Sequence, residues 1–117
     1  MYTAVKARDL ITGTGRTARF DGDAYGSGVS FFLVDNDPGE GPDLHRHPYT
    51  ETWVVRSGRA LITADGEQIE VEPGDILVVG AGTHHKFENL GPGRLEIMCI
   101  HASPRIIQED LDDVEDG

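Results

Sequence analysis

The stretch GEGPDLHRHPYTETWVVRSG, residues 39–58, carries the pattern that decides the fold. His45 and His47 lie two residues apart, and on a β-strand such side chains share a face, about 6 to 7 Å from each other. Glu51 has the same parity but would lie about 13 Å beyond His47 on an extended chain, too far for ligand bonds of about 2 Å. Pro48 lacks an N–H and favours a turn, so we expect Glu51 to return beside His47 on the next strand.

A second stretch, GDILVVGAGTHHKFEN at residues 74–89, sets another histidine among glycines. Its spacing is Gly74-x5-Gly80-x-Gly82-x2-His85-x3-Asn89. Imidazole nitrogens and carboxylate oxygens are ordinary ligands of divalent transition metals. The two stretches together therefore predict a metal site, with the ligands His45, His47, Glu51 and His85.

Short segments rich in β-branched and aromatic residues recur along the chain between turn signals. Asp65-Gly66 is the kind of dipeptide that takes positive φ in a tight hairpin. So many short strands in 117 residues cannot leave many edges exposed, which predicts an all-β fold with a closed or nearly closed barrel. The predicted strands cover residues 29–34, 44–47, 51–56, 60–64, 68–71, 76–79, 84–88 and 95–101.

The chain is long enough for one core, so we expect one barrel domain with an appendage at each end. Residues 1–28 are glycine-rich and weakly periodic, which indicates an irregular N-terminal arm with room for one edge strand near residues 17–20. The barrel is placed at residues 29–103. Residues 104–117 are predicted to form a short C-terminal helix with an acidic tail, because a serine–proline pair is followed by apolar residues at helical spacing, Ile107, Leu111 and Val114.

Charge and composition exclude some partners. The formal net charge is −11, and no basic stripe is interleaved with aromatic residues, so neither nucleic acid nor an anionic membrane is an expected partner. The start of the chain lacks the apolar centre of a signal peptide, and no apolar run approaches the ~18 residues of a membrane span, so a cytoplasmic location is expected. Cys99 is the only cysteine and is interpreted as a buried apolar filler rather than a catalytic thiol.

The two glycine-punctuated motifs resemble those of the cupin superfamily, over about half of the chain, residues 39–89. The first motif agrees at every defined position, and the second departs once, since Gly80 stands where cupins usually carry proline. The resemblance implies a double-stranded β-helix, or jelly-roll, barrel with a metal at its mouth. Carried across, the ligands are again His45, His47, Glu51 and His85. The chain is similar in particular to small single-domain, quercetin-dioxygenase-like cupins.

Three imidazoles and one carboxylate suit Fe, Mn, Ni, Co, Cu or Zn, and the order of affinities does not choose among these metals. We expect one divalent transition metal per subunit. In an octahedral site, four protein ligands leave two positions for substrate, water or dioxygen. His84 adjoins His85 and is predicted to face away from the site, whereas His101 could face either the cavity or solvent.

The leading hypothesis is a small mononuclear metal enzyme, dioxygenase-like, that acts on a small metal-chelating substrate. In it, Glu51 doubles as the catalytic base when it loosens from the metal. The alternatives are a redox-neutral lyase, isomerase or cyclase with Zn or Ni, and a non-catalytic barrel that binds a small ligand. A homodimer paired through an edge strand or the N-terminal arm is expected. The side chains predicted to line an apolar pocket are Tyr49, Trp53, Phe87, Met98 and His101.

Overall fold

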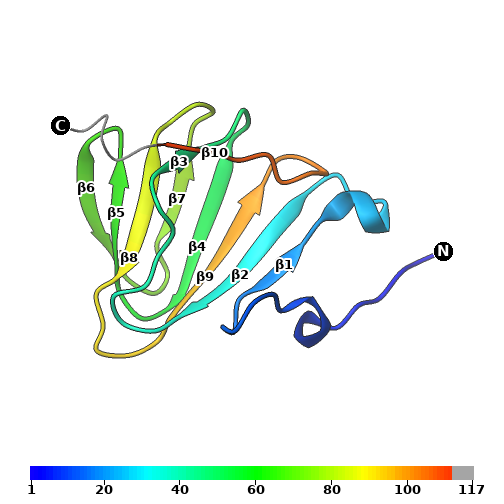
Figure 1. Cartoon of the computed structure of the whole chain (residues 1–117), viewed down its shortest axis with the longest axis horizontal. Coiled ribbons are helices and arrows are strands. Elements are labelled where there is room, and N and C mark those ends of the chain that lie inside the picture. The colour runs from blue at the N-terminus through cyan, green and yellow to red at the C-terminus, as the bar shows by residue number, and fades with distance from the viewer. Residues whose placement is uncertain (112–117) are drawn as a thin grey trace.

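The structure is a computed structural model that describes residues 1–111. Within these residues, two five-stranded antiparallel sheets pack face to face around one core (Figure 1). The first sheet has the order β1 (Ala18–Phe20), β2 (Ser30–Asn36), β9 (Leu95–His101), β4 (Glu51–Ser57) and β7 (Ile76–Val79). The second sheet has the order β10 (Glu109–Asp110), β3 (His45–Arg46), β8 (His85–Asn89), β5 (Ala60–Ala64) and β6 (Glu67–Val71). The prediction of an all-β jelly-roll fold is confirmed.

The strand order brings together segments that are far apart in the sequence. β4 pairs with β9 in the first sheet, and β3 pairs with β8 in the second. Because β3 and the start of β4 carry the first histidine motif and β8 carries the second, this topology sets the two motifs beside each other at one end of the molecule (Figure 1).

Side-chain alternation along the strands builds the core. In β9, Leu95, Ile97 and Cys99 are each at most 2% exposed, whereas their neighbours Glu96 and Met98 point outward. Burial of such apolar side chains stabilises the fold by about 1.5 to 3 kcal/mol for each large one. The buried core cluster draws on both sheets and comprises Val34, Trp53, Val55, Ala60, Ile62, Val71, Val79, Phe87, Leu95, Ile97 and Cys99.

Two turns show why particular residues are needed. Asp65 and Gly66 have φ of 49° and 81° and join β5 to β6, which is the tight hairpin that the dipeptide predicts. Gly58, the last glycine of the first motif, has φ of +84°, and a Cβ on it would lie 2.4 Å from the carbonyl oxygen of Arg94. Gly58 is therefore required both by its backbone conformation and by lack of space.

The predicted C-terminal helix is wrong for the part of residues 104–117 that the structure describes. Residues 104–108 are irregular, and β10 then pairs with β3. The backbone of this segment bonds to the barrel instead of to itself, since the N–H of Leu111 donates to the carbonyl of Leu44 at 2.9 Å. These tertiary bonds outweigh the weak helical periodicity. Val114 and the acidic tail beyond Leu111 lie outside the described residues.

The N-terminal segment contains a 3-10 helix, η1 (Ala7–Leu10), then β1 at the edge of the first sheet, then a second 3-10 helix, η2 (Gly22–Tyr25). The expected edge strand near residues 17–20 is thus present as β1. Ahead of η1 the chain extends away from the sheets (Figure 1). Among the described residues, no helix is long and apolar enough to cross a membrane.

Candidate metal centre

Four side chains from three different segments converge at one end of the barrel. His45 lies in β3 and pairs with His85, the first residue of β8, while Glu51 opens β4. His47 follows β3, just before the turn that Pro48 was expected to start. One ligand atom from each of the four residues lies within 4.8 Å of all the others, and all four side chains are buried. Their arrangement fits a divalent metal ion.

The protein orients three of the imidazoles through backbone carbonyls. Nδ1 of His45 donates to the carbonyl of Asp43 at 2.7 Å, and Nδ1 of His85 donates to that of Thr83 at 2.8 Å. Nδ1 of His47 donates to the carbonyl of Ile107 at 2.7 Å. A carbonyl can only accept a hydrogen bond, so each ring carries a proton on Nδ1, and in its neutral form it turns the lone pair of Nε2 inward. This is the arrangement that metal-binding histidines require.

The inward-facing atoms have no hydrogen-bond partners of their own. Nε2 of His47 and Nε2 of His85 each lie 3.2 Å from Oε1 of Glu51. None of these three atoms makes an aligned hydrogen bond, although all are buried. Buried polar atoms without partners are costly, and a cation among them would satisfy all three at once. The residues present therefore fit the metal that the sequence motifs imply.

Electrostatics keep the carboxylate ionised. Burial alone would raise the pKa of Glu51, but its contacts with the imidazoles of His101, His47 and His85 outweigh burial and hold the pKa well below its usual range. Burial lowers the pKa of His45 to about 4, so this imidazole is neutral at neutral pH. The site thus offers an anionic oxygen and a neutral ring nitrogen without any change of protonation.

His101 faces the cavity rather than solvent and is 1% exposed. It pairs with Glu51 across β4 and β9, and its Nε2 lies 3.2 Å from Oε2 of Glu51. Its Nδ1 lies 2.6 Å from the hydroxyl of Tyr49. The prediction that Tyr49 lines the cavity is wrong: Tyr49 is not among the lining residues, and its hydroxyl contacts the far nitrogen of His101.

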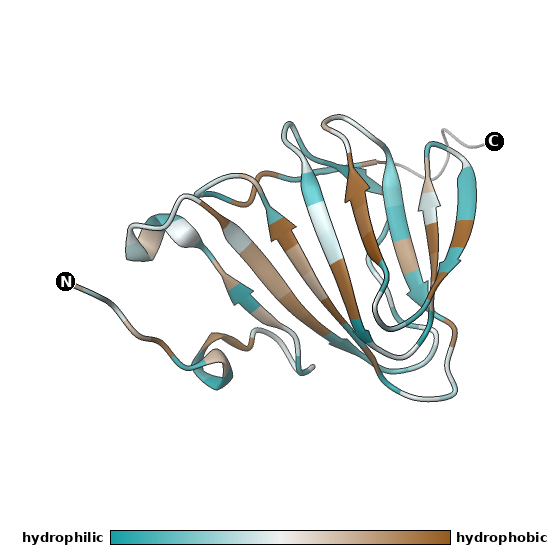
Figure 2. Ribbon diagram, turned by 180° about the vertical axis from the view of Figure 1, so that it is seen from behind, coloured by the Kyte–Doolittle hydropathy of each residue, from teal (hydrophilic) through white to brown (hydrophobic). Residues whose placement is uncertain are grey.

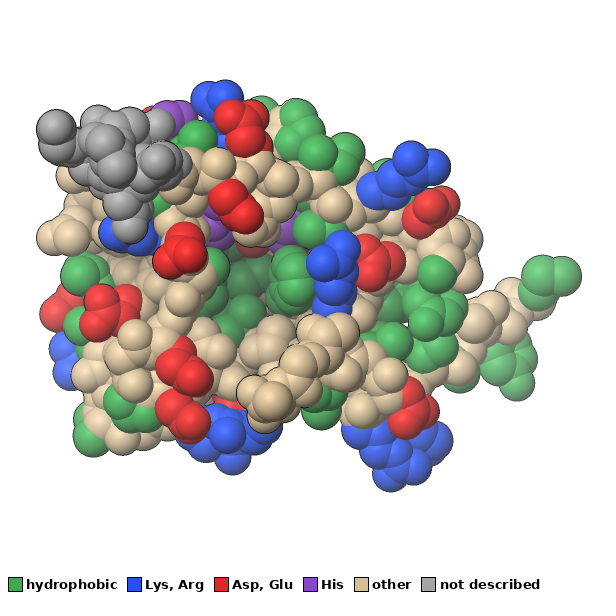
Figure 3. All heavy atoms as spheres, viewed as in Figure 1, with side chains coloured by type: hydrophobic (Ala, Val, Ile, Leu, Met, Phe, Trp, Pro, Cys, Tyr) green, Lys and Arg blue, Asp and Glu red, His purple; other side chains and the backbone are tan. Residues whose placement is uncertain are grey.

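A cavity of about 750 Å³ opens beside the cluster. Figure 3 shows this hollow, with hydrophobic side chains on its floor and histidines at its upper wall. Of the predicted pocket residues, Trp53, Phe87 and His101 line it together with His45 and Glu51. Other apolar parts of the wall come from Phe32, Val34 and Cys99. Burial raises the pKa of the Cys99 thiol well above its usual range, which suits the filler role predicted for it.

Two residues singled out in the sequence lie elsewhere. Met98 does not line this cavity, and that prediction is wrong: its neighbours Ile97 and Cys99 face inward, so Met98 points to the outer face of the first sheet, where it borders a separate hollow. His84 precedes β8 and is not in the metal-type cluster; its Nε2 lies 3.3 Å from a guanidinium nitrogen of Arg46, away from the site as predicted.

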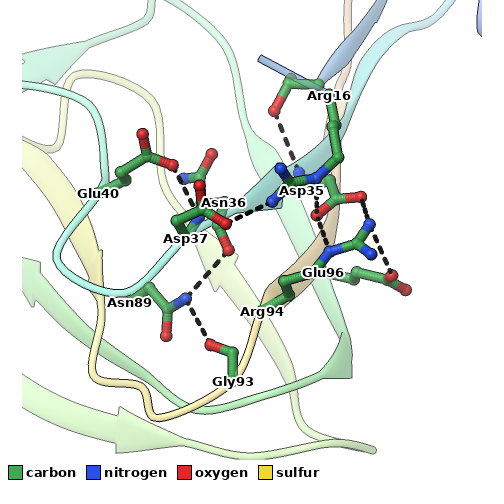
Figure 4. Close-up of polar contacts among 10 residues, drawn as sticks. Arg16, Asp35, Asn36, Asp37, Glu40, Asn89, Gly93, Arg94 and Glu96 are labelled. Carbon is green, nitrogen blue, oxygen red and sulfur yellow. Dashed lines mark hydrogen bonds and ion pairs between the residues drawn. The ribbon is translucent and has the colours of Figure 1, made fainter.

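At the mouth of the cavity, charged side chains neutralise one another (Figure 4). Arg16, which lines the cavity, contacts Asp37 at 2.6 Å and Asp35 at 3.2 Å. Asp35 also binds Arg94, with one contact at 2.9 Å. The positive charge of Arg16 is thus already matched by two carboxylates, so this arginine is a poor anchor for an anionic substrate.

The asparagine that closes the second motif has a structural role. Its amide nitrogen donates to the carbonyls of Asn36 at 3.1 Å and Gly93 at 2.9 Å (Figure 4). Its amide oxygen accepts from the N–H of Gly91 at 2.7 Å. Asn89 therefore ties the end of β8 to β2 and to the loop before β9.

Sequence reasoning missed the carbonyls of Asp43, Thr83 and Ile107 that orient the ligands. Two of them sit two residues before the histidine that they orient, a local relation that spacing could have revealed. The third is contributed from 60 residues away, at the approach to β10. A backbone carbonyl is common to every residue type, so no pattern of side chains could have indicated Ile107.

Known proteins can now be compared with this geometry. A family model described as the cupin domain matches residues 32–101, which include all four cluster residues. The chain belongs to the cupin family. This cupin is 41% identical over 63 residues to the protein MJ1618 of Methanocaldococcus jannaschii, a match that covers 52% of this chain and 50% of that protein.

Two further relatives have named functions. The cupin is 30% identical over 75 residues to the tetracenomycin polyketide synthase protein TcmJ of Streptomyces glaucescens, covering 62% of this chain and 50% of TcmJ. It is 35% identical over 60 residues to quercetin 2,3-dioxygenase of Bacillus subtilis, covering 49% of this chain and 18% of the dioxygenase. The chain thus spans half or less of the length of these relatives.

Solved structures agree on the fold. An oxalate decarboxylase of Lactobacillus farciminis in complex with formate superposes with a TM-score of 0.77 at 21% identity, over 88% of this chain and 34% of that chain. An oxalate oxidase superposes with a TM-score of 0.72 at 23% identity, over 81% of this chain and 54% of that chain. Both likenesses show the cupin fold.

Proposed function

We propose that this cupin is a small mononuclear metal enzyme that acts on a metal-chelating organic substrate, with dioxygenase-type chemistry as its activity. The observation that carries the proposal is the convergence of buried, unpartnered ligand atoms of three histidines and one glutamate at the wall of a cavity of about 750 Å³. The ligands are His45, His47, Glu51 and His85, and the candidate metals are Fe, Mn, Ni, Co, Cu and Zn.

The side chains divide the work of such a site. A bound divalent metal would act as a Lewis acid toward substrate oxygens and, if it is redox-active, would support reaction with dioxygen. The three imidazoles would hold the cation without adding charge, while Glu51 would supply one negative charge. The low pKa of Glu51 keeps it ionised at neutral pH, as a metal ligand must be, but also makes it a weak base. As the base of the proposed reaction, Glu51 would therefore accept a proton only from a substrate hydroxyl that bound metal has made more acidic.

The cavity favours an aromatic or conjugated substrate over a small dicarboxylate. Trp53, Phe87 and Phe32 give its wall flat apolar surfaces, which suit a ring system. The arginine at its mouth is paired with aspartates, so the described lining residues offer no unmatched cation to a second carboxylate. The names of two relatives, a quercetin dioxygenase and a polyketide synthase protein, point the same way.

Oxygen uptake tests this function. We would load the purified protein anaerobically with Fe(II), Mn(II) or Ni(II) and then add air with a catechol, an enediol or a flavonol. We expect at least one metal and substrate pair to consume oxygen, and the His85→Ala protein treated in the same way to consume none. If no metal and substrate pair consumes oxygen, the dioxygenase function is rejected. If the His85→Ala protein consumes oxygen at the same rate as the wild type, metal bound outside the site is responsible for the reaction.

A redox-neutral lyase, isomerase or cyclase with Zn or Ni is the second candidate. Such a reaction would need only the Lewis acidity of a metal, and three imidazoles with one carboxylate suit Zn and Ni as well as Fe. Elemental analysis of protein purified from its native host separates the two candidates. Zn at one equivalent supports the redox-neutral reaction, whereas Fe supports the dioxygenase.

A further inference from the structure

We propose that Tyr49 and His101 are positioning residues: the Tyr49 hydroxyl fixes the proton of His101 on Nε2, so that His101 holds Oε2 of Glu51 as a hydrogen-bond donor and does not serve as a fifth metal ligand. The inference rests on the proposed metal site, because it concerns which carboxylate oxygen of Glu51 would bind the metal ion.

The hydrogen bonds of the Tyr49 hydroxyl determine its direction. The backbone N–H of Ile107 donates to this oxygen at 3.0 Å. Nδ1 of His47 is 3.4 Å away, but its proton is already directed to the carbonyl of Ile107 at 2.7 Å, so it offers no lone pair. Among the described residues, the acceptor left for the hydroxyl proton is Nδ1 of His101, at 2.6 Å.

A neutral imidazole has one N–H and one lone pair, so accepting a hydrogen bond at Nδ1 puts the proton on Nε2. His101 is thereby the opposite tautomer of His45, His47 and His85, each of which donates from Nδ1 to a carbonyl. Those three rings present lone pairs to the centre, whereas His101 presents a proton. A protonated nitrogen cannot bind a metal.

The position of His101 agrees with its tautomer. Its Nε2 lies 3.2 Å from Oε2 of Glu51, while Oε1 faces Nε2 of His47 and of His85 at 3.2 Å each. His101 is absent from the group of ligand atoms that lie within 4.8 Å of one another. Its Nε2 is buried and 3.2 Å from Oε2, but the contact is not aligned as a hydrogen bond in this structure, so the donation that we propose requires a small rotation of the ring or of the carboxylate.

The two oxygens of Glu51 are therefore assigned different partners. Oε1 belongs to the cation and Oε2 to His101, which makes Glu51 a ligand through one oxygen. Without the donor, the carboxylate is free to turn, and the orientation of Oε1 toward the other ligand atoms would be lost. Residues that orient a ligand in this way typically contribute about 10- to 100-fold to metal affinity.

Imidazole ¹⁵N NMR of the Zn(II)-loaded, ¹⁵N-labelled protein tests the assignment directly, because two-bond correlations separate the two tautomers. We expect His45, His47 and His85 to carry Nδ1 protons with zinc-shifted Nε2, and His101 to carry its proton on Nε2. A zinc-shifted nitrogen or an Nδ1 proton on His101 would overturn the proposal. If the protein takes up no zinc, the metal site itself fails, and the tautomer of His101 is still measurable in the metal-free protein.

Variants separate a donor from a merely structural side chain. The amide nitrogen of glutamine can take the place of Nε2, so His101→Gln should keep Zn(II) affinity within about 3-fold, whereas His101→Leu and Tyr49→Phe should each lose about 10- to 100-fold. Tyr49→Phe should also move the His101 proton to a mixture of both nitrogens. His84→Gln, which alters a histidine outside the cluster, is the matched control. Equal losses in His101→Gln and His101→Leu would refute the donor role.

Discussion

At the scale of single residues, His85 offers the sharpest test of the site, because its neighbour His84 provides a matched control. His85→Ala removes one of the inward-facing nitrogens and should lower the affinity for Mn(II) or Zn(II) by at least about 100-fold. Loss of a residue that only orients a ligand typically lowers metal affinity by about 10- to 100-fold, and loss of a ligand should lower it further. His84→Ala removes a side chain that faces Arg46 and should leave the affinity within about 3-fold. Titration against a chelating indicator measures both. Similar losses in the two variants would mean that the cluster is not the binding site.

The pKa shifts of the ligands give the binding a pH dependence. Burial lowers the pKa of His47, but Glu51 and the carbonyl of Ile107 outweigh burial and leave it raised above 6.5. The pKa of His45 is about 4. At pH values below the pKa of His47, a cation must therefore displace a proton from that ring, whereas above about pH 5 it displaces none from His45.

The sign of the effect follows from that competition. The logarithm of the association constant should rise with pH from about pH 5 up to the pKa of His47, because the cation replaces a proton on that ring, and should then level off. Chelator competition at a series of pH values measures the slope. An affinity that is flat over this range, or that falls as pH rises, would contradict the protonation states assigned here.

The sequence predicted the residues of the cluster because their spacing reflects strand geometry directly. His45 and His47 share parity, and Pro48 marks the turn that returns Glu51. Met98 shows where such reasoning was applied wrongly, since it differs in parity from Cys99 and His101 on the same strand and so faces outward. The orientation of His101 depends on where β9 ends and on what Tyr49 contacts, and neither is encoded in local spacing.

At the scale of elements, the C-terminal segment was predicted least well. Ile107 and Leu111 match a helical period, but so short a run carries little weight beside tertiary hydrogen bonds. The backbone of Ile107 supplies both an acceptor for His47 and a donor for Tyr49, and a helix would have withdrawn these groups from the site. Only the folded barrel shows that such partners exist.

The loop that enters β8 can be tested at the position where this chain departs from the cupin pattern. Gly80 has no left-handed φ, and a Cβ on it would meet only Thr83 Oγ1, at 3.6 Å. Gly80→Ala should therefore raise the free energy of unfolding by about 0.4 to 1 kcal/mol, because alanine restricts the unfolded chain. Gly82 has φ of +79°, so Gly82→Ala should lower it by about 1 to 2 kcal/mol. Urea unfolding compares the two, and stabilisation by both would refute the explanation.

At the scale of the whole molecule, the outer face of the first sheet is unusually apolar. Figure 2 shows β7 coloured as hydrophobic along its length, and its outward residues Ile76 and Val78 are 66% and 64% exposed. β7 is also the edge of its sheet, next to β4. An exposed apolar edge strand is a liability for a monomer, which favours pairing with a second copy.

We therefore expect the protein to be a homodimer at micromolar concentration, with this edge in the interface. Val78→Lys would bury an unpaired charge there and should shift light scattering from the dimer mass to the 12.7 kDa monomer. Ile69→Lys changes a residue that is 53% exposed on β6 of the other sheet, so it should leave the dimer intact. A monomeric wild-type protein would reject the dimer, and loss of the dimer only in Ile69→Lys would place the interface on β6 instead. Because the metal cluster lies within a single chain, the Val78→Lys monomer should still bind metal with unchanged stoichiometry, which separates assembly from the site.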